Sequence, residues 1–254
     1  MLLAIDLGNT NTVLGLFDGD VLAAQWRLTT LHERTVDEYA VLFHSLFQLH
    51  GKMVNWVSDV IICSVVPPSL PWIVAAVRQT FQLEPIIVDP PTAGGMPIRY
   101  VNPAEVGADR IVNAIAAYHE FGGPLVIIDF GTATTFCAVS AAGEYLGGAI
   151  APGVKISTDA LFRATAKLPR VSIEPMKSVI GDTTVTSIQA GVFYGYLGLI
   201  EGIVSRMIRE LSYPTKVIAT GGLAALFAPS LPFIDVVDPH LTLKGLRLIH
   251  HKHR

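Results

Sequence analysis

Residues 6–12, with the sequence DLGNTNT, decide the fold, because this polar, turn-rich stretch separates two short apolar runs. The run before it is LLAI at residues 2–5, and the run after it is VLGLF at residues 13–17. A second turn signal, DGD at residues 18–20, leads into a third run at residues 21–28. Apolar runs bounded by Gly, Asn and Asp are typical of strands joined by tight turns. We therefore predict three consecutive strands at the start of the chain.

The same pattern returns near the middle of the chain. LVII at residues 125–128 precedes DFGTATT at residues 129–135, and FCAV at residues 136–139 follows. Two copies of one strand–turn–strand unit predict an internal duplication, with a first lobe of residues 1–118 and a second lobe of residues 119–254. The two turns are expected to face each other across a cleft.

The segments after the first copy predict alternating helices and strands. Thr35 and Glu38 form a capping-box pattern at the start of an amphipathic helix. A buried strand is predicted at residues 60–63, a helix at residues 72–81, and a strand at residues 86–88. Strands that alternate with helices indicate an α/β architecture.

Composition excludes several functions. Apolar residues make up 51% of the chain and charged residues 15%, which favours sheets covered on both faces or a large subunit interface. A net charge of -3 gives no reason to expect nucleic acid as a partner. Cys63 and Cys137 lie in apolar runs without metal-ligand spacing, which is typical of buried thiols in a reducing compartment.

Residues 184–204 are apolar and long enough to span a bilayer. Gln189 and Glu201 interrupt the stretch, so we expect a long buried helix of a soluble protein and no membrane partner. The chain ends in a basic segment with His250, His251 and His253, for which a solvated terminus is expected.

An Asp-x-Gly turn after a strand can bind phosphate, because glycine allows backbone amides to approach the oxygens closely. Threonine hydroxyls in both turns can add hydrogen bonds, and the carboxylates of Asp6 and Asp129 can hold a cation near the phosphates. The alternative is a plain tight turn in which Asp bonds its own backbone. The duplication favours the nucleotide-binding interpretation.

Six ordered motifs resemble those of type III pantothenate kinase, in the acetate and sugar kinase, Hsc70 and actin superfamily. They are DLGNTNT at 6–12, GADR at 107–110, DFGTAT at 129–134, GGAIAPG at 147–153, TAKLP at 165–169 and TGG at 220–222. The resemblance implies an α/β fold of duplicated ribonuclease H-like (actin-like ATPase) domains, with mixed β-sheets flanked by helices. It also implies ATP-dependent phosphorylation of pantothenate to 4'-phosphopantothenate, the first step of coenzyme A biosynthesis, by a cytoplasmic homodimer.

The resemblance assigns roles to individual residues. Asp109 is the implied catalytic base, although capping of a helix is its local alternative. Asp129 is the implied ligand of a monovalent cation, K⁺ or NH₄⁺, and Asp6 holds Mg²⁺ through the phosphates. The implied ATP contacts are Asp6, Gly8, Asn9, Thr10, Asn11, Thr12, Gly131, Thr132, Gly221 and Gly222. The implied pantothenate contacts are Tyr100, Gly107, Ala108, Asp109, Arg110 and Thr184.

Two other functions remain open within the superfamily. One is hydrolysis of a phosphoanhydride, with Asp109 positioning water, and the other is a nucleotide-binding regulator without catalysis. The presence of Asp6, Asp109 and Asp129 argues against the regulator. Fold resemblance alone does not separate a kinase from a hydrolase.

Overall fold

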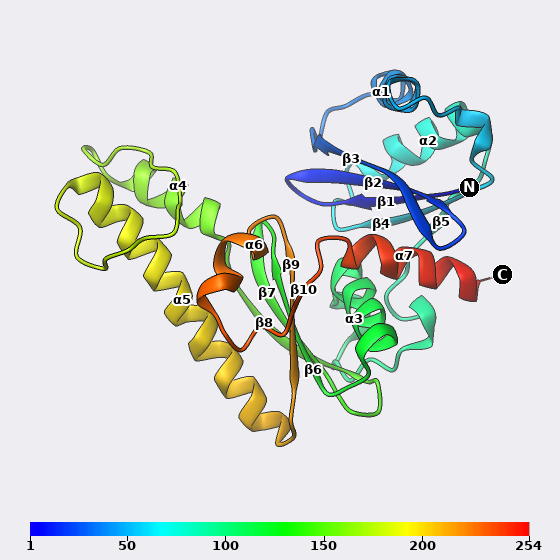
Figure 1. Ribbon diagram of the computed structural model, residues 1–254. Helices are drawn as coiled ribbons and strands as arrows, with labels where there is room; N and C mark the ends of the chain where they lie inside the picture. Colours follow the sequence, from blue (N-terminus) through cyan, green and yellow to red (C-terminus); the bar gives the residue numbers. More distant parts are fainter. Residues whose placement is uncertain (254) are drawn as a thin grey trace. The chain divides into compact units, whose positions relative to one another are not determined.

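Two five-stranded mixed sheets form the core of the computed structural model, which describes residues 1–253 (Figure 1). Each sheet belongs to its own unit. The first unit contains Met1–Met96, Val101–Ala116 and the C-terminal helix, and the second contains Pro97–Tyr100 and Ala117–His240.

The sheet of the first unit has the strand order β3-β2-β1-β4-β5. Its central strand β1 pairs antiparallel with β2 and parallel with β4, while β2–β3 is antiparallel and β4–β5 is parallel. The strands are β1 (Leu2–Leu7), β2 (Asn11–Asp18), β3 (Val21–Thr29), β4 (Asp59–Ser64) and β5 (Ile86–Ile87).

The sheet of the second unit repeats this arrangement in the order β10-β9-β6-β7-β8. Here β6 pairs antiparallel with β7 and parallel with β9. The strands are β6 (Leu125–Phe130), β7 (Ala133–Val139), β8 (Tyr145–Pro152), β9 (Lys216–Gly221) and β10 (Val236–Val237). The two equivalent sheets confirm the predicted α/β fold with a duplicated strand–turn–strand pattern.

Helices α1 (Val36–Leu49) and α2 (Leu70–Phe81) cover one face of the first sheet (Figure 1). The predicted capping box starts α1, because Thr35 accepts from Glu38 N and Glu38 accepts from Thr35 N. Phe43 and Phe47 of α1 pack with Leu3 and Ile5 of β1 in one buried cluster. Short 3-10 turns lie at Val54–Trp56, Ala93–Gly95 and Pro103–Glu105.

The C-terminal helix α7 (Leu241–Lys252) packs on β1, β4 and β2 of the first unit. The expected lobe of residues 119–254 placed this segment with the second copy, so the division of the chain differs there. His250 is only 3% exposed and its Nε2 lies 3.4 Å from Asp59 Oδ1. The expected solvated tail is therefore wrong for His250, whereas His251 and His253 are exposed. Arg254 lies outside the described residues.

Helix α3 (Ala108–Phe121) begins in the first unit, and the chain enters the second unit after Ala116. Helix α7 crosses α3 closely, and the Thr242 hydroxyl donates to Asn113 Oδ1 at 2.8 Å. At Gly245, an added Cβ would overlap the backbone oxygen of Val112. The contact between these two helices therefore requires glycine at position 245.

In the second unit, α4 (Val154–Ala164), the long α5 (Thr184–Leu211) and α6 (Ala224–Phe227) accompany the sheet, with a 3-10 turn at Ala228–Ser230. Buried side chains of α5 pack against β6 and β7, among them Phe193, Tyr196 and Ile200. The opposite side exposes Gly191, Gly195 and Gly198, and a Cβ on each would meet nothing within 4 Å. Only one side of α5 is therefore buried against the rest of the chain.

By length and composition, α5 could cross a membrane, and it is the one helix among residues 1–253 that meets this test. Of the residues in its most apolar 18-residue stretch, 33% are buried against the rest of the chain. The side of α5 that faces β6 and β7 is packed as in the core helix of a globular domain. Length and composition alone are therefore weak evidence that α5 spans a membrane.

Replacement of Gly245 by Ala should destabilise the first unit. The added methyl group overlaps the Val112 backbone, and overpacking of this kind costs about 1–3 kcal/mol. Urea unfolding of the two proteins measures the difference. His251→Ala, an exposed change on the same helix, is the control and should leave the midpoint nearly unchanged. An equal midpoint for Gly245→Ala would contradict the tight crossing.

Candidate functional site

The first predicted phosphate turn joins β1 to β2. A hydrogen bond of 3.1 Å from Gly8 N to Asn11 O closes it, and Asn9 and Thr10 are exposed at its tip. A Cβ on Gly8 would lie 3.0 Å from Asn11 O, so little space remains there for a side chain. The turn presents exposed backbone and two polar side chains, a surface that suits an anion.

Thr12 is placed differently from the tip residues. Its side chain is fully buried, and its Oγ1 lies 2.9 Å from Thr30 Oγ1. The residue therefore supports the turn from inside the unit, away from the exposed tip.

The second turn joins β6 to β7 and is one residue shorter. Leu7 pairs with Thr12 across the first turn, whereas Phe130 pairs with Thr134 across the second. The bond from Gly131 N to Ala133 O, 3.0 Å, closes the second turn, and Gly131 and Thr132 are exposed. Strand register thus makes Thr134 the counterpart of Thr12, a correspondence that simple residue spacing misses by one position.

Asp129 and Gly221 are brought together at the ends of β6 and β9. A Cβ on Gly221 would lie 2.5 Å from Asp129 Oδ1, and Gly221 has a φ of +90°. Both the close carboxylate and the backbone conformation therefore require glycine. The expected cation ligand and the first glycine of the expected adenosine motif are neighbours in the second unit, and Gly222 beside them is exposed.

Asp109 lies in the first turn of α3. Its Oδ1 accepts a hydrogen bond of 2.8 Å from Arg110 N, and a Cβ on Gly107 would lie 2.6 Å from the same oxygen. Glycine at 107 thus leaves room for the carboxylate. Burial raises the pKa of Asp109 above its ordinary value of 3.8, against the opposing effects of the Arg110 N–H and charge. Ala108 and Arg110 are themselves buried.

Cys63 of β4 connects Asp109 to the first turn. Its position pairs with Asp6 across the parallel strands β1 and β4. Burial raises the pKa of the Cys63 thiol well above its ordinary value, and the charges of Asp6 and Asp109 raise it further. Both carboxylates therefore lie near one buried thiol. The first unit gathers the phosphate turn and the predicted base in one place.

Tyr100 lies on a short strap, Pro97–Tyr100, that belongs to the second unit. Two backbone bonds of 2.8 Å, from Tyr145 N to Pro97 O and from Arg99 N to Tyr145 O, attach the strap to β8. Arg99 also donates to Glu144 Oε1 through Nε and Nη2, at 2.9 and 2.5 Å. A Cβ on Gly147 would lie 3.3 Å from the Tyr100 ring, so the tyrosine packs over that glycine.

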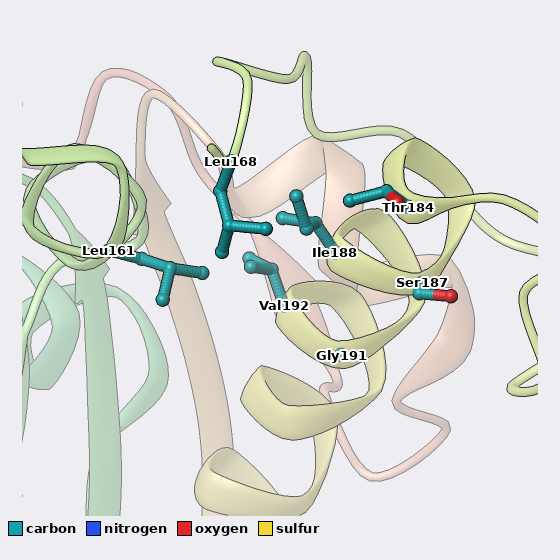
Figure 2. Close-up of a pocket in the computed structure, with 7 residues that line it drawn as sticks. All are labelled: Leu161, Leu168, Thr184, Ser187, Ile188, Gly191 and Val192. Carbon is teal, nitrogen blue, oxygen red and sulfur yellow. The ribbon is translucent and has the colours of Figure 1, made fainter. Parts of the chain in front are cut away.

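Thr184 is the first residue of α5, after the N-cap Thr183. It lines a cavity of about 580 Å³ beside α4 and α5, in which aliphatic side chains point toward one another (Figure 2). The lining residues are Leu161, Leu168, Thr184, Ser187, Ile188, Gly191 and Val192. Tyr100 is not among the residues that line this cavity.

Sequence reasoning missed two supporting residues, Cys63 and Thr30. Cys63 had been expected only as a small buried side chain, which it is. A signal was present, because Cys63 ends a predicted strand that could lie parallel to the strand of Asp6.

Within residues 1–253 no group of three or more His, Cys, Asp or Glu side chains could hold a metal ion.

Asp109→Asn should stabilise the fold at neutral pH. Because the folded-state pKa is raised, the free energy of unfolding of the parent falls as pH rises from 3.8 to that raised value. The amide variant lacks this loss, so its advantage should grow across that window and then stay constant. Urea unfolding at several pH values measures it. Asp18→Asn, at an exposed carboxyl, controls for the loss of a charge. A constant difference at all pH values would contradict the prediction.

The family model for type III pantothenate kinase matches residues 2–206. Over 254 residues, all of both chains, the sequence is 54% identical to the type III pantothenate kinase of Anaeromyxobacter sp. (strain K). It is 51% identical over 252 residues to that of Geobacillus sp. (strain WCH70), covering 99% of this chain and 98% of the relative.

Solved structures show the same fold at low sequence identity. A conserved putative Baf family transcriptional activator from Campylobacter jejuni aligns with a TM-score of 0.63 and 20% identity, over 99% of this chain and 98% of its own. The ethanolamine utilization protein EutJ from Carboxydothermus hydrogenoformans aligns with a TM-score of 0.54 and 15% identity, over 97% and 89%. The fold is therefore the duplicated ribonuclease H-like, actin-like ATPase fold. With its motifs in order and its relatives matching from end to end, the chain belongs to the type III pantothenate kinase family.

Proposed function

We propose that the chain transfers the γ-phosphoryl group of ATP to the primary alcohol of pantothenate, giving 4'-phosphopantothenate and ADP in the first step of coenzyme A biosynthesis. The observation that carries this proposal is the position of Asp109 near the end of β1. A Cβ on Gly107, two residues before Asp109, would lie 3.7 Å from Val65, and Val65 N donates to Leu7 O, directly after Asp6. One carboxylate ends the strand before an exposed phosphate turn, and the other is an enclosed base. Membership of the pantothenate kinase family supports the same reaction.

In this reaction the alcohol oxygen forms a bond to the γ-phosphorus, and the bond from that phosphorus to the bridging oxygen of ADP breaks. The alcohol proton passes to the Asp109 carboxylate. Burial raises the pKa of this carboxyl, which makes the ionised group a stronger base than a solvated aspartate. Gly107 and the Arg110 N–H hold its position.

Two cations are part of the proposal. Mg²⁺, held through the ATP phosphates on the side of Asp6, would neutralise charge that develops on the transferred group. A monovalent cation, K⁺ or NH₄⁺, would bind near Asp129, whose carboxylate lies against the end of β9 at Gly221. Hard oxygen ligands fit both assignments.

The remaining assignments concern binding. The exposed residues Asn9, Thr10, Gly131 and Thr132, with the half-buried Gly8, support contacts to phosphate. For pantothenate, we propose contacts from Tyr100 on its strap, from the Gly107–Arg110 segment, and from Thr184. Arg110 is 6% exposed, so a contact with the pantothenate carboxylate would be made by the small accessible part of its side chain.

The two alternatives make different demands on this site. A phosphoanhydride hydrolase would use Asp109 to position water, and would form ADP without an alcohol. A non-catalytic regulator would not need a base, yet Asp109 is kept next to a glycine that makes room for its carboxylate. The enclosed Asp109 favours catalysis, and the family favours the alcohol acceptor.

A coupled ADP-release assay tests the reaction. ADP should form only when pantothenate is present, and more rapidly with K⁺. In Asp109→Asn, kcat should fall about 10²- to 10⁴-fold, the range expected for loss of a general base, while ATP affinity by calorimetry stays similar. ADP formation that ignores pantothenate would support the hydrolase, and near-normal turnover of the variant would remove Asp109 from the base role.

We further propose a soluble, cytoplasmic homodimer that associates through α5. The helix buries Phe193, Tyr196 and Ile200 on its own sheet and leaves Gly191, Gly195 and Gly198 exposed. A glycine face lets a second helix approach closely, and Thr184 and the cavity lie at the N-terminal end of the same helix. A partner subunit on this face would help to complete the pantothenate site.

Gly195→Arg should convert the dimer into monomers, because a long charged side chain would occupy the exposed face of α5. Analytical ultracentrifugation measures the mass of each protein. Val41→Arg, on the exposed side of α1 in the first unit, is the matched control and should remain dimeric. A monomeric parent, or a dimeric Gly195→Arg, would contradict the proposed interface.

A further inference from the structure

Thr30 lies directly after β3 and touches the first phosphate turn at several points. Its backbone N donates to Thr10 O at 3.0 Å, and its Oγ1 donates to Gly8 O at 2.7 Å. The same Oγ1 lies 2.9 Å from the Oγ1 of Thr12. Thr30 is only 7% exposed, so these bonds are shielded from water.

The direction of these bonds follows from the chemistry of a hydroxyl group, which has one proton. Thr30 gives its proton to Gly8 O, so Thr12 must be the donor between the two threonines. A chain from Thr12 through Thr30 to Gly8 results. Buried bonds in such a chain strengthen one another, and loss of the central hydroxyl leaves both neighbours without that partner.

The bonds hold both sides of the turn. Gly8 follows β1, Thr10 precedes β2 and Thr12 lies in β2, and Thr30 contacts all three. Asn9, at the tip between these attachments, is exposed. Thr30, a buried residue that directly follows β3, therefore sets the position of the backbone at the tip.

In the second unit, a glycine stands at the position equivalent to Thr30. Gly153 N donates to Thr132 O at 3.1 Å, as Thr30 N does to Thr10 O, so Gly153 is the counterpart of Thr30. A Cβ on Gly153 would overlap Thr132 O and lie 2.8 Å from Gly131 O. No side chain can enter there, and the hydroxyl of Thr134, the counterpart of Thr12, has no partner among the described residues. Thr30 therefore has no side-chain counterpart at the second turn, where Gly153 stands in its place.

We propose that Thr30 is a positioning residue for the first phosphate turn, and that its hydroxyl holds the turn backbone ready to bind the phosphates of ATP. The proposal rests on the proposed kinase function. Binding by a turn that is already ordered avoids the entropy of ordering it in the complex. Thr30 should therefore affect ATP and leave pantothenate binding unchanged.

Thr30→Val tests this, because valine keeps the shape and removes the hydroxyl. Loss of two hydrogen bonds should raise KM for ATP roughly tenfold or more, with KM for pantothenate within about twofold of the parent. Thr30→Ser restores the hydroxyl and should recover most of the ATP affinity. Thr29→Val, at the exposed neighbouring position, is the matched control and should behave like the parent.

Thr30→Cys extends the series if the valine variant does not fold, since a thiol is a small but weaker donor. KM for ATP should then rise in the order Thr, Ser, Cys. An unchanged KM for ATP in the folded variants, or equal losses for ATP and pantothenate, would overturn the proposal. A parent without pantothenate-dependent ADP release would instead refute the kinase function, and ATP affinity by calorimetry would still test Thr30.

Discussion

Each unit depends on one central strand that pairs antiparallel on one side and parallel on the other. In the first unit this is β1, between β2 and β4, and in the second it is β6, between β7 and β9. The antiparallel side creates a tight turn at the strand's carboxyl end. The parallel side brings the end of another strand to the same edge, so Asp6 meets Cys63 and Asp129 meets Gly221. The candidate site residues therefore lie where the pairing pattern places them.

Duplication has not kept the two turns alike. The first is one residue longer, and the Thr12–Thr30–Gly8 chain holds it from inside. The second is shorter and is crossed at Gly153 by backbone alone. A longer turn has more conformations available, so it needs the additional bonds more than the shorter one does. The two copies thus reach a similar exposed tip by different means.

The site also carries a cost in stability. Burial of Asp109 raises its pKa, which means that the folded state holds the ionised carboxylate less well than the unfolded chain does. The same enclosure strengthens the group as a base. Three glycines are constrained by packing around the site, because a side chain at each would collide with a carboxylate or a backbone oxygen. They are Gly107, Gly221 and Gly153. Function and packing both constrain these positions.

The sequence by itself determined the strands on both sides of each turn, the capping box of α1, and the family, because these depend on local patterns and on the order of motifs. Tertiary structure decided the rest. It placed α7 on the first unit, since Gly245 allows a close crossing with α3 that lies far away in the chain. It buried Thr12, an implied ATP contact, and His250, which was expected in a solvated terminus. It also identified Thr30 and Cys63, whose roles depend on neighbours across strands. Contacts between distant segments leave no periodic signal in a single sequence, so only the folded chain reveals them.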